Sequence, residues 1–258
     1  MCYFSNMNRT PRHALIKNLQ TSLPRGMPFD LAALERIEVS AQLAAHYVES
    51  GWLDRLGQGI YAFAGDTLTA HGAVKLLQTR VTGMHVGGKS ALALQGVRHN
   101  LAGQETLVLW GDARFTLPVW FTSRFPSRYV AAQLFGTLEA GLLAKSLTTP
   151  PGVRDGLRVS VPERAVLELL YDVGTHQGLE EARNLFDGVR NLRKDVLGKL
   201  LQSCTSIKTV RLFLTWARET SLVDVEALRR DYALPVGSEK RWISRMKDGQ
   251  LLSLQPYG

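Results

Sequence analysis

The sequence is poor in cysteine and has no long apolar run. Only two of its 258 residues are cysteines, Cys2 and Cys204, which lie far apart and have no histidine at ligand spacing. Such usage argues against a disulfide framework and against a zinc site. No uninterrupted apolar stretch approaches the ~20 residues that a membrane span needs, and residues 1–13 contain no apolar signal core. We therefore expect a cytoplasmic protein without a membrane partner.

The sequence also lacks a recognisable catalytic constellation. Its histidines are scattered along the chain, at His13, His46, His71, His85, His99 and His176. Neither a Ser–His–Asp set nor a pair of carboxylates can be assigned. No internal repeat or low-complexity linker is visible. We therefore predict no catalytic residue, no metal and no cofactor, and a protein that is not an enzyme.

What the sequence does have is a hydrophobic content suited to a core and an excess of basic residues. Hydrophobic residues make up 45% of the chain and charged residues 21%, which is typical of a globular chain that can bury more than one core. The formal net charge is +8, and this favours a polyanionic or acidic partner. The basic excess is concentrated in residues 1–28, 75–134 and 190–218. Charge runs are usually solvated faces, but three separate zones suggest more than one contact surface.

Residues 1–66 show the order of elements of a winged helix-turn-helix. Pro11 can open a first helix. Asp30 and Ser40 are candidate N-caps of a second and a third helix, and Gly51 can end the third. Residues 52–65 (WLDRLGQGIYAFAG) then predict a β-hairpin with a glycine-rich tip. Three helices followed by a two-stranded wing form a module whose third helix enters the major groove of DNA.

The third helix is expected to carry the base-reading residues on the face opposite its apolar stripe. Gln can make a bidentate contact to adenine, His can donate to guanine or phosphate, and Ala can touch a thymine methyl. Basic residues of the first helix and the wing would contact phosphate. The predicted DNA-binding residues are Arg12, Lys17, Arg25, Ser40, Gln42, Ala45, His46, Arg55 and Gln58.

The same module can also serve as a protein-interaction domain. Residues 1–66 are nearly neutral once their acids are counted, and Glu38, Glu49 and Asp54 would repel phosphate if they faced it. A structural adaptor that uses the winged helix only for protein contacts is therefore an alternative to DNA binding.

Residues 83–90 (GMHVGGKS) satisfy the G-x-x-x-x-G-K-[ST] pattern of a nucleotide-binding P-loop. In such a loop, backbone N–H groups bind the phosphates. Lys89 would contact the β- and γ-phosphates, and Ser90 would hold Mg²⁺. A P-loop follows a buried strand, however, whereas residues 71–82 have helical spacing and residues 84–86 look like a short strand. We expect a strand, a glycine turn and a helix, and keep a P-loop NTPase as the enzyme alternative.

The remainder of the chain predicts strands followed mainly by helices. The expected strands are residues 105–111, 114–123 and 156–161, and residues 240–246 and 250–256 can supply one or two edge strands. The expected helices are residues 162–173, 178–189, 195–204 and 207–219. The predicted fold class is α+β, with a winged helix-turn-helix in residues 1–66. A larger mixed domain in residues 67–258 follows, with a small sheet and a helical C-terminal half.

Three stretches of the sequence resemble the AbiEi antitoxins of bacterial type IV toxin–antitoxin (abortive-infection) systems. They are GQGIYAF (57–63), HVGGKSALALQGV (85–97) and SVPERAVLELL (160–170). The resemblance runs over nearly the whole chain. It implies that the winged helix represses the toxin–antitoxin operon, and that the C-terminal domain neutralises a nucleotidyltransferase toxin. It also implies that the glycine-rich turn is a fold element, while Glu49 departs from a strongly basic reading helix.

The implied partners are therefore double-stranded promoter DNA, expected to carry inverted repeats, and a cognate nucleotidyltransferase toxin. For the toxin, the hypothesis is a basic surface that complements the metal-binding carboxylates of its active site or contacts a nucleic acid that it modifies. A solvated face is the alternative. The candidate residues are Arg190, Arg193, Lys194, Lys199, Lys208 and Arg211. A ligand-sensing regulator is a further alternative, which requires a deep apolar pocket with convergent polar groups in the second domain.

Overall fold

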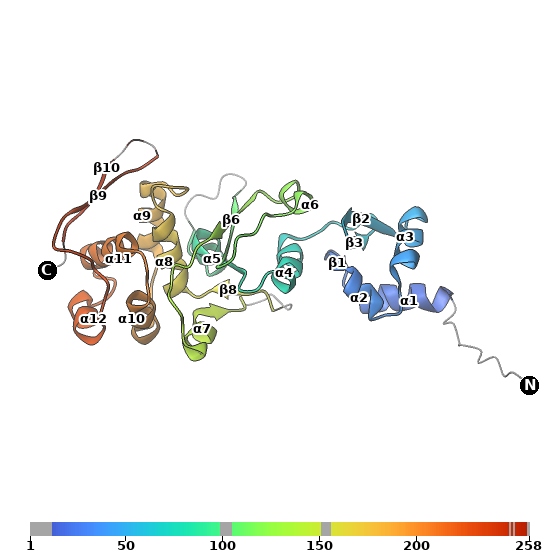
Figure 1. Cartoon of the computed structure of the whole chain (residues 1–258), viewed down its shortest axis with the longest axis horizontal. Helices are drawn as coiled ribbons and strands as arrows, with labels where there is room; N and C mark the ends of the chain where they lie inside the picture. Colours follow the sequence, from blue (N-terminus) through green and yellow to red (C-terminus); the bar gives the residue numbers. More distant parts are fainter. Residues whose placement is uncertain (1–11, 99–104, 151–155, 248, 250, 257–258) are drawn as a thin grey trace, which may run out of the picture. The chain divides into compact units, whose positions relative to one another are not determined.

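The structure is a computed structural model that describes residues 12–98, 105–150, 156–247, 249 and 251–256. Side chains are described from residue 16 onward. The chain forms two compact units, Met1–Thr79 and Arg80–Gly258, and the order of their elements can be followed in Figure 1. In the described part of the chain, no helix is both long and apolar enough to cross a membrane.

The first unit consists of short helices and a three-stranded antiparallel sheet. Its elements are α1 (Arg12–Ser22), β1 (Phe29–Asp30), α2 (Leu31–Glu35), α3 (Ala41–Glu49), β2 (Leu53–Gly57) and β3 (Ile60–Phe63), followed by α4 (Ala70–Arg80). The strand order is β1-β3-β2. The hairpin β2–β3 is the predicted wing, and the third strand, β1, was not predicted. Its two residues pair with Tyr61 and Ile60 and join the segment before α2 to the wing.

The predicted helix caps of this unit are confirmed. The Asp30 carboxylate accepts a hydrogen bond from Ala33 N at 2.9 Å, and the Ser40 hydroxyl accepts one from Leu43 N at 3.3 Å. Both bonds satisfy backbone N–H groups that a helix start leaves without a partner. Gly51 follows α3 with φ of 73°, a left-handed conformation that glycine adopts without strain. The cap of Ser40 therefore fixes where α3 begins.

A single apolar core holds α1, α2, α3 and the wing together. Its buried members are Leu19, Phe29, Leu34, Val39, Ala44, Tyr47, Leu53, Tyr61 and Phe63. Phe29 of β1 meets Phe63 of β3 edge to face, with ring centroids 5.4 Å apart. Because core residues come from α3 and from all three strands, α3 and the wing are held in one rigid arrangement.

The second unit is built on a mixed five-stranded sheet with strand order β6-β5-β4-β8-β7. The strands are β4 (His85–Val86), β5 (Leu107–Gly111), β6 (Ser127–Ala131), β7 (Leu147–Thr148) and β8 (Val159–Ser160), and the short helices α5 (Gly88–Leu94), α6 (Val119–Thr122) and α7 (Ala140–Ser146) are interspersed. The pairs β5–β6 and β4–β8 are parallel, and the other two pairs are antiparallel. Strand 105–111 is thus confirmed as β5, and strand 156–161 is reduced to β8.

The prediction of a strand over residues 114–123 is wrong. Pro118 stands at the N-cap of α6, and Trp120 and Phe121 of this helical turn are buried. The fixed φ of proline suits the start of a helix, and the packing of two adjacent aromatic side chains outweighs the strand propensity of the segment. The edge strand that pairs with β5 on the side away from β4 is β6, which was not predicted.

The C-terminal part is helical, as predicted. It contains α8 (Pro162–Asp172), α9 (Leu179–Gly188), α10 (Lys194–Gln202), α11 (Ile207–Thr220) and α12 (Val225–Asp231). The strands β9 (Trp242–Arg245) and β10 (Leu251–Leu254) form a separate hairpin rather than an edge of the larger sheet. α8 is buried along most of its length and packs against α5, α9, α10 and α11. The predicted α+β fold class is confirmed.

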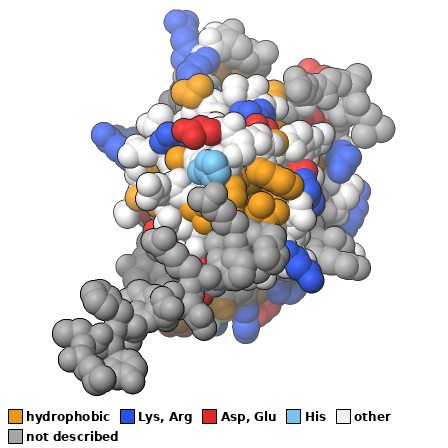
Figure 2. Space-filling model, turned by 90° about the vertical axis from the view of Figure 1, so that its right-hand side faces the viewer, with side chains coloured by type: hydrophobic (Ala, Val, Ile, Leu, Met, Phe, Trp, Pro, Cys, Tyr) orange, Lys and Arg blue, Asp and Glu red, His pale blue; other side chains and the backbone are white. Residues whose placement is uncertain are grey.

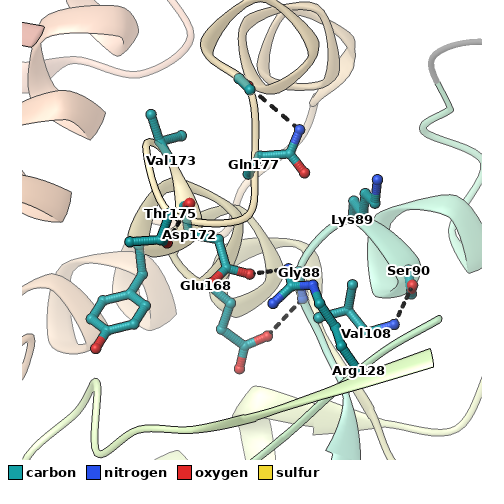
Figure 3. Close-up of polar contacts among 12 residues, drawn as sticks. Gly88, Lys89, Ser90, Val108, Arg128, Glu168, Asp172, Val173, Thr175 and Gln177 are labelled. Carbon is teal, nitrogen blue, oxygen red and sulfur yellow. Dashed lines mark hydrogen bonds and ion pairs between the residues drawn. The ribbon is translucent and has the colours of Figure 1, made fainter. Parts of the chain in front are cut away.

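A buried carboxylate in the middle of α8 joins the glycine-rich turn to the sheet. Glu168 is completely buried. One of its oxygens accepts from His85 Nε2 at 2.8 Å and from Arg164 Nε at 2.7 Å. The other accepts from Gly88 N at 3.0 Å, as Figure 3 shows, and from Ser160 Oγ at 2.8 Å. The donors lie in β4, α5, β8 and α8, so one side chain links four elements.

Both ring nitrogens of His85 have an acceptor nearby. Its Nε2 faces the carboxylate of Glu168, and its Nδ1 lies 2.8 Å from the carbonyl oxygen of Gly83. The guanidinium of Arg164, which is always charged, contacts the same carboxylate. The charge of Glu168 is therefore compensated inside the protein by Arg164.

The turn before α5 requires glycine because it lies directly against this cluster. A Cβ atom on Gly87 would lie 2.4 Å from Glu168 Oε2 and 2.5 Å from Cδ1 of Trp110, far inside van der Waals contact. Gly88 has φ of 52°, a conformation that other residues rarely adopt. The two glycines thus allow the backbone to reach the carboxylate.

Substitution Glu168→Gln should lower the free energy of unfolding by about 3–5 kcal/mol at neutral pH, because the buried cation of Arg164 loses its counter-charge. Burial alone would raise the pKa of Glu168, but the charges and hydrogen bonds of His85 and Arg164 outweigh it and lower the pKa from 4.5 to about 2. A pKa lowered on folding stabilises the protein above the unfolded pKa, and this stabilisation is lost as the pH falls.

Urea unfolding of the wild-type protein and of Glu168→Gln, at pH 7 and at about pH 2 to 5, measures the contribution of Glu168 to stability. The wild-type protein should lose stability as the pH falls from 4.5 toward 2, and the variant should lack that part of the loss. Glu180→Gln, at an exposed residue of α9, is the matched control. Wild-type stability in Glu168→Gln would contradict the proposed role of the carboxylate.

Candidate nucleic-acid interface and basic segments of the second unit

The exposed face of α3 presents the residues predicted to read bases. Gln42, Ala45 and His46 are exposed, whereas Ala44 and Tyr47 are buried in the core of the first unit. This division follows the helical period, since residues three and four apart share a face. The structure therefore brings the three predicted side chains together on a free surface.

Ser40 and the wing residues flank this face. The Ser40 hydroxyl accepts the capping bond of α3, yet the residue is exposed and its O–H can still donate to a phosphate. Arg55 of β2 and Gln58 at the hairpin tip are exposed. Arg55 makes one long contact, 3.5 Å from Nε to the carbonyl oxygen of Gly57. Its guanidinium can therefore turn to an external anion at little cost.

The remaining basic candidates of the first unit have different surroundings. Lys17 of α1 is exposed. Arg25 pairs with Asp66, 2.9 Å from Nη1 to Oδ1, and its guanidinium lies 4.3 Å from the centroid of the Phe63 ring. This places Arg25 in an internal contact that joins the loop before β1 to the end of the wing. Arg12 is the first residue of α1, and its side chain lies outside the described side chains.

The charge of this surface is mixed. Glu49 of α3 and Asp54 of β2 are exposed together with the polar candidates. In the view of Figure 2, Lys and Arg side chains occur at several separate places, with an acidic and a His side chain between them. Attraction to DNA phosphate would thus come from individual cations rather than from one continuous patch.

The residues of the P-loop pattern all have partners within the second unit. Lys89 pairs with Glu181 at 3.0 Å, and the Ser90 hydroxyl accepts from Val108 N at 2.9 Å. Gly88 N donates to Glu168, so a protein carboxylate occupies the place where a phosphate would lie. Figure 3 shows the last two contacts. The helix α4 and the two-residue strand β4 precede the glycine turn, and α5 follows it. The expected order of strand, glycine turn and helix is therefore confirmed.

One member of the predicted basic surface is not on the surface. Arg211 is only 2% exposed, and its guanidinium donates to backbone carbonyls of the segment after α12. The acceptors are Val236 at 2.6 Å, Lys240 at 2.8 Å and Ser238. The assignment of Arg211 to a toxin-binding surface is therefore wrong, because its charge is used to hold this segment on α11.

Two further members are held by internal contacts. Lys208 donates to the carbonyl oxygens of Tyr171 and Val173, the latter at 2.8 Å, and burial lowers the pKa of its ammonium group. Arg193 forms a bidentate pair with the buried Glu163, both contacts being 2.9 Å. Burial alone would raise the pKa of Glu163, but the hydrogen bonds and charge of Arg193 lower it. Arg193 thus neutralises a buried acid.

The other three members remain exposed around α10. Lys194 pairs with Asp231 at 2.7 Å across an open surface, a contact that contributes little. Arg190, which precedes α10, is exposed, and its Nη1 donates to the carbonyl oxygens of Asp187 and Val189, the latter at 2.7 Å. Lys199 is exposed and has no hydrogen-bond partner among the described residues. We call Arg190, together with Lys194 and Lys199 of the helix itself, the exposed cations of α10.

The cluster around Glu168 has one local signal in the sequence. This signal is the Arg164–Glu168 spacing of four residues in a helix, which places both side chains on one face. His85 was expected in a short strand but without a partner. Its pairing with a residue 83 positions away depends on how the sheet and α8 pack, which the sequence does not display.

Comparison with protein families gives matches along almost the whole chain. Residues 12–103 match the family model described as transcriptional regulator, AbiEi antitoxin N-terminal domain. Residues 104–255 match the model described as transcriptional regulator, AbiEi antitoxin, type IV TA (toxin–antitoxin) system. No curated protein matches the chain significantly.

Among solved structures, the chain is similar to the RV2827C protein from Mycobacterium tuberculosis. The TM-score is 0.55 and the sequence identity 14%, over 92% of this chain and 90% of that one. At this identity the similarity supports the fold alone, and the family models carry the assignment. The chain belongs to the AbiEi antitoxins, the family of transcriptional regulators of type IV toxin–antitoxin systems.

Proposed function

We propose that this protein represses its own toxin–antitoxin operon by binding promoter DNA through α3 and the wing. The supporting observation is the exposed face of α3, where Gln42, Ala45 and His46 stand clear of the core that fixes the helix. Their types match the donors, acceptors and apolar groups of base edges in the major groove. The promoter lies in the cytoplasm, where the protein would act.

In this arrangement each element has one task. α3 enters the major groove, and the wing, with Arg55 and Gln58, follows the backbone or the adjacent minor groove. Lys17 adds a sequence-independent contact to phosphate. Arg25 contributes mainly by bracing the wing through Asp66. If two copies bind, inverted repeats in the promoter would match their two-fold symmetry.

The proposal for neutralisation assigns the second unit to a cognate nucleotidyltransferase toxin. A nucleotidyltransferase holds catalytic metal with carboxylates, and the exposed cations of α10 are an electrostatic complement to such a site. They remain available because Arg211, Lys208 and Arg193 carry the internal contacts of this region. No catalytic step of the antitoxin itself is proposed.

Replacing Gln42 with Ala should weaken binding to the promoter by ~1–3 kcal/mol and relax the preference at one base position, because one bidentate base contact is lost. Gel shifts on promoter fragments with each base varied in turn measure this effect. Glu35→Ala, at an exposed residue of α2, is the control. Unchanged affinity of the Gln42/His46 double variant would remove α3 as the reading helix.

Replacing Arg55 with Ala should weaken binding to promoter and to unrelated DNA alike. The slope of log affinity against log salt should become shallower by about one unit, because one phosphate contact releases fewer counterions. Binding assays over a series of salt concentrations give this slope. A loss confined to the promoter sequence would instead assign base reading to the wing.

Reversing the exposed cations of α10, with Arg190, Lys194 and Lys199 all changed to Glu, should abolish rescue of cells from the toxin while promoter affinity and unfolding midpoint stay at wild-type values. Attraction becomes repulsion at the contact with the toxin. Arg193 is left in place because its removal would leave Glu163 buried without a partner.

The control variant carries the same change of charge at Arg114, Arg245 and Lys247, which are exposed and lie outside α10. It should rescue cells normally, which separates a local contact from the effect of net charge. Growth after induction of the toxin is the measurement. Full rescue by the α10 variant at normal expression would move the toxin contact elsewhere.

A further inference from the structure

The second unit contains a cavity of about 440 Å³ beside the Glu168 cluster. It lies at the carboxyl ends of the parallel strands β5 and β6, and residues 132–138, α7 and α8 complete its wall. The volume lies in the range of small-molecule sites. The carboxyl ends of parallel strands are also a usual place for ligands in sheets of this kind.

The base of the cavity contains the guanidinium of Arg164. Arg164 and His85 both line the cavity, although Arg164 is only 7% exposed and His85 only 1%. Both contact the carboxylate of Glu168. Nη1 of Arg164 lies 3.2 Å from Ser146 Oγ, while Nη2 has no hydrogen-bond partner among the described residues. The guanidinium can therefore donate into the cavity.

One part of the side wall is apolar, beside the polar Gln133, Thr137 and Thr205. Leu134, Phe135, Leu138 and Leu143 form this apolar part, and the Arg164 guanidinium lies 5.2 Å from the centroid of the Phe135 ring. Leu143 is 45% exposed, so part of this apolar surface is open to solvent. A cavity with a buried cation at its base and an apolar patch in its wall suits a molecule with one charged end and one apolar end.

The lining contains one carboxylate, that of Asp112. Asp112 is exposed, and its charge also acts on Tyr129, where burial first and Asp112 second raise the pKa of the phenol. Solvent screens an exposed charge more than a buried one. The buried guanidinium of Arg164 is thus the main charged donor that faces the cavity, and Asp112 opposes the binding of an anion there only weakly.

We propose that this cavity binds a small organic anion, whose carboxylate or phosphate group contacts Arg164 and whose apolar body packs against Phe135 and Leu138. This site is separate from the surfaces assigned above to DNA and to the toxin, and it does not depend on either assignment.

Isothermal titration calorimetry on the full-length protein tests the proposal with four probes. Benzoate and phenyl phosphate both combine an oxyanion with a ring, and the tighter of the two identifies the preferred anion. Benzamide has the ring without the charge, and inorganic phosphate has the charge without the ring. We expect benzoate or phenyl phosphate to bind about tenfold or more tightly than benzamide and than inorganic phosphate. No binding of either aromatic anion in the low-millimolar range, or equal binding of benzamide, would overturn the proposal.

Variants locate the bound anion. Arg164→Met should reduce the affinity for the anion about tenfold or more. Leu138→Trp should also reduce this affinity, because the larger side chain fills the cavity. It leaves the Glu168 cluster unchanged, so the test remains valid if Arg164→Met does not fold. Asp112→Asn should tighten binding by about threefold because a repelling charge is removed. Leu251→Trp, at an exposed residue of β10, is the matched control and should bind as wild type. Wild-type binding by Leu138→Trp would place the anion elsewhere and contradict the site.

Discussion

The carboxylate of Glu168 fixes the geometry of the second unit. It receives hydrogen bonds from residues 83 and 80 positions earlier in the chain, and from one eight positions earlier, at distances of 2.8 to 3.0 Å. A buried charge in this position is destabilising unless its partners are all present. The strand β4, the glycine turn and α8 therefore depend on one another for their positions. Gly87 and Gly88 allow the backbone to approach a carboxylate of the protein rather than a nucleotide phosphate.

The same physical rule separates the two kinds of basic residue in this unit. Arg193 and Arg211 are held by a buried acid and by backbone carbonyls, and so their charges serve the fold. Lys199 is exposed and has no hydrogen-bond partner among the described residues, so its charge is directed to solvent or to a partner. A count of Lys and Arg along residues 190–218 cannot make this distinction, because the acceptors of Arg211 lie 25 to 29 positions away.

In the first unit, local signals carried most of the structure. Asp30 and Ser40 are residues that prefer N-caps, and Gly51 and Gly59 lie where positive φ is needed, so both helix starts and the hairpin could be predicted from short stretches. The strand β1 could not be predicted, since its two residues have no local pattern and pair with Tyr61 and Ile60.

In the second unit, the prediction of a strand over residues 114–123 was wrong for a related reason. The apolar residues of this segment favour a strand locally, but burial of Trp120 and Phe121 selects a helical turn.

The central claim is that α3 lies on promoter DNA while the second unit remains available to other partners. Photocrosslinking tests it directly, with a photoreactive amino acid at position 45 of α3 or, in a second protein, at position 199 of α10, each incubated with the promoter of its own operon. The account predicts crosslinks from position 45 that map to bases within one half-site, and none above background from position 199. Crosslinks from position 199 without any from position 45 would contradict it.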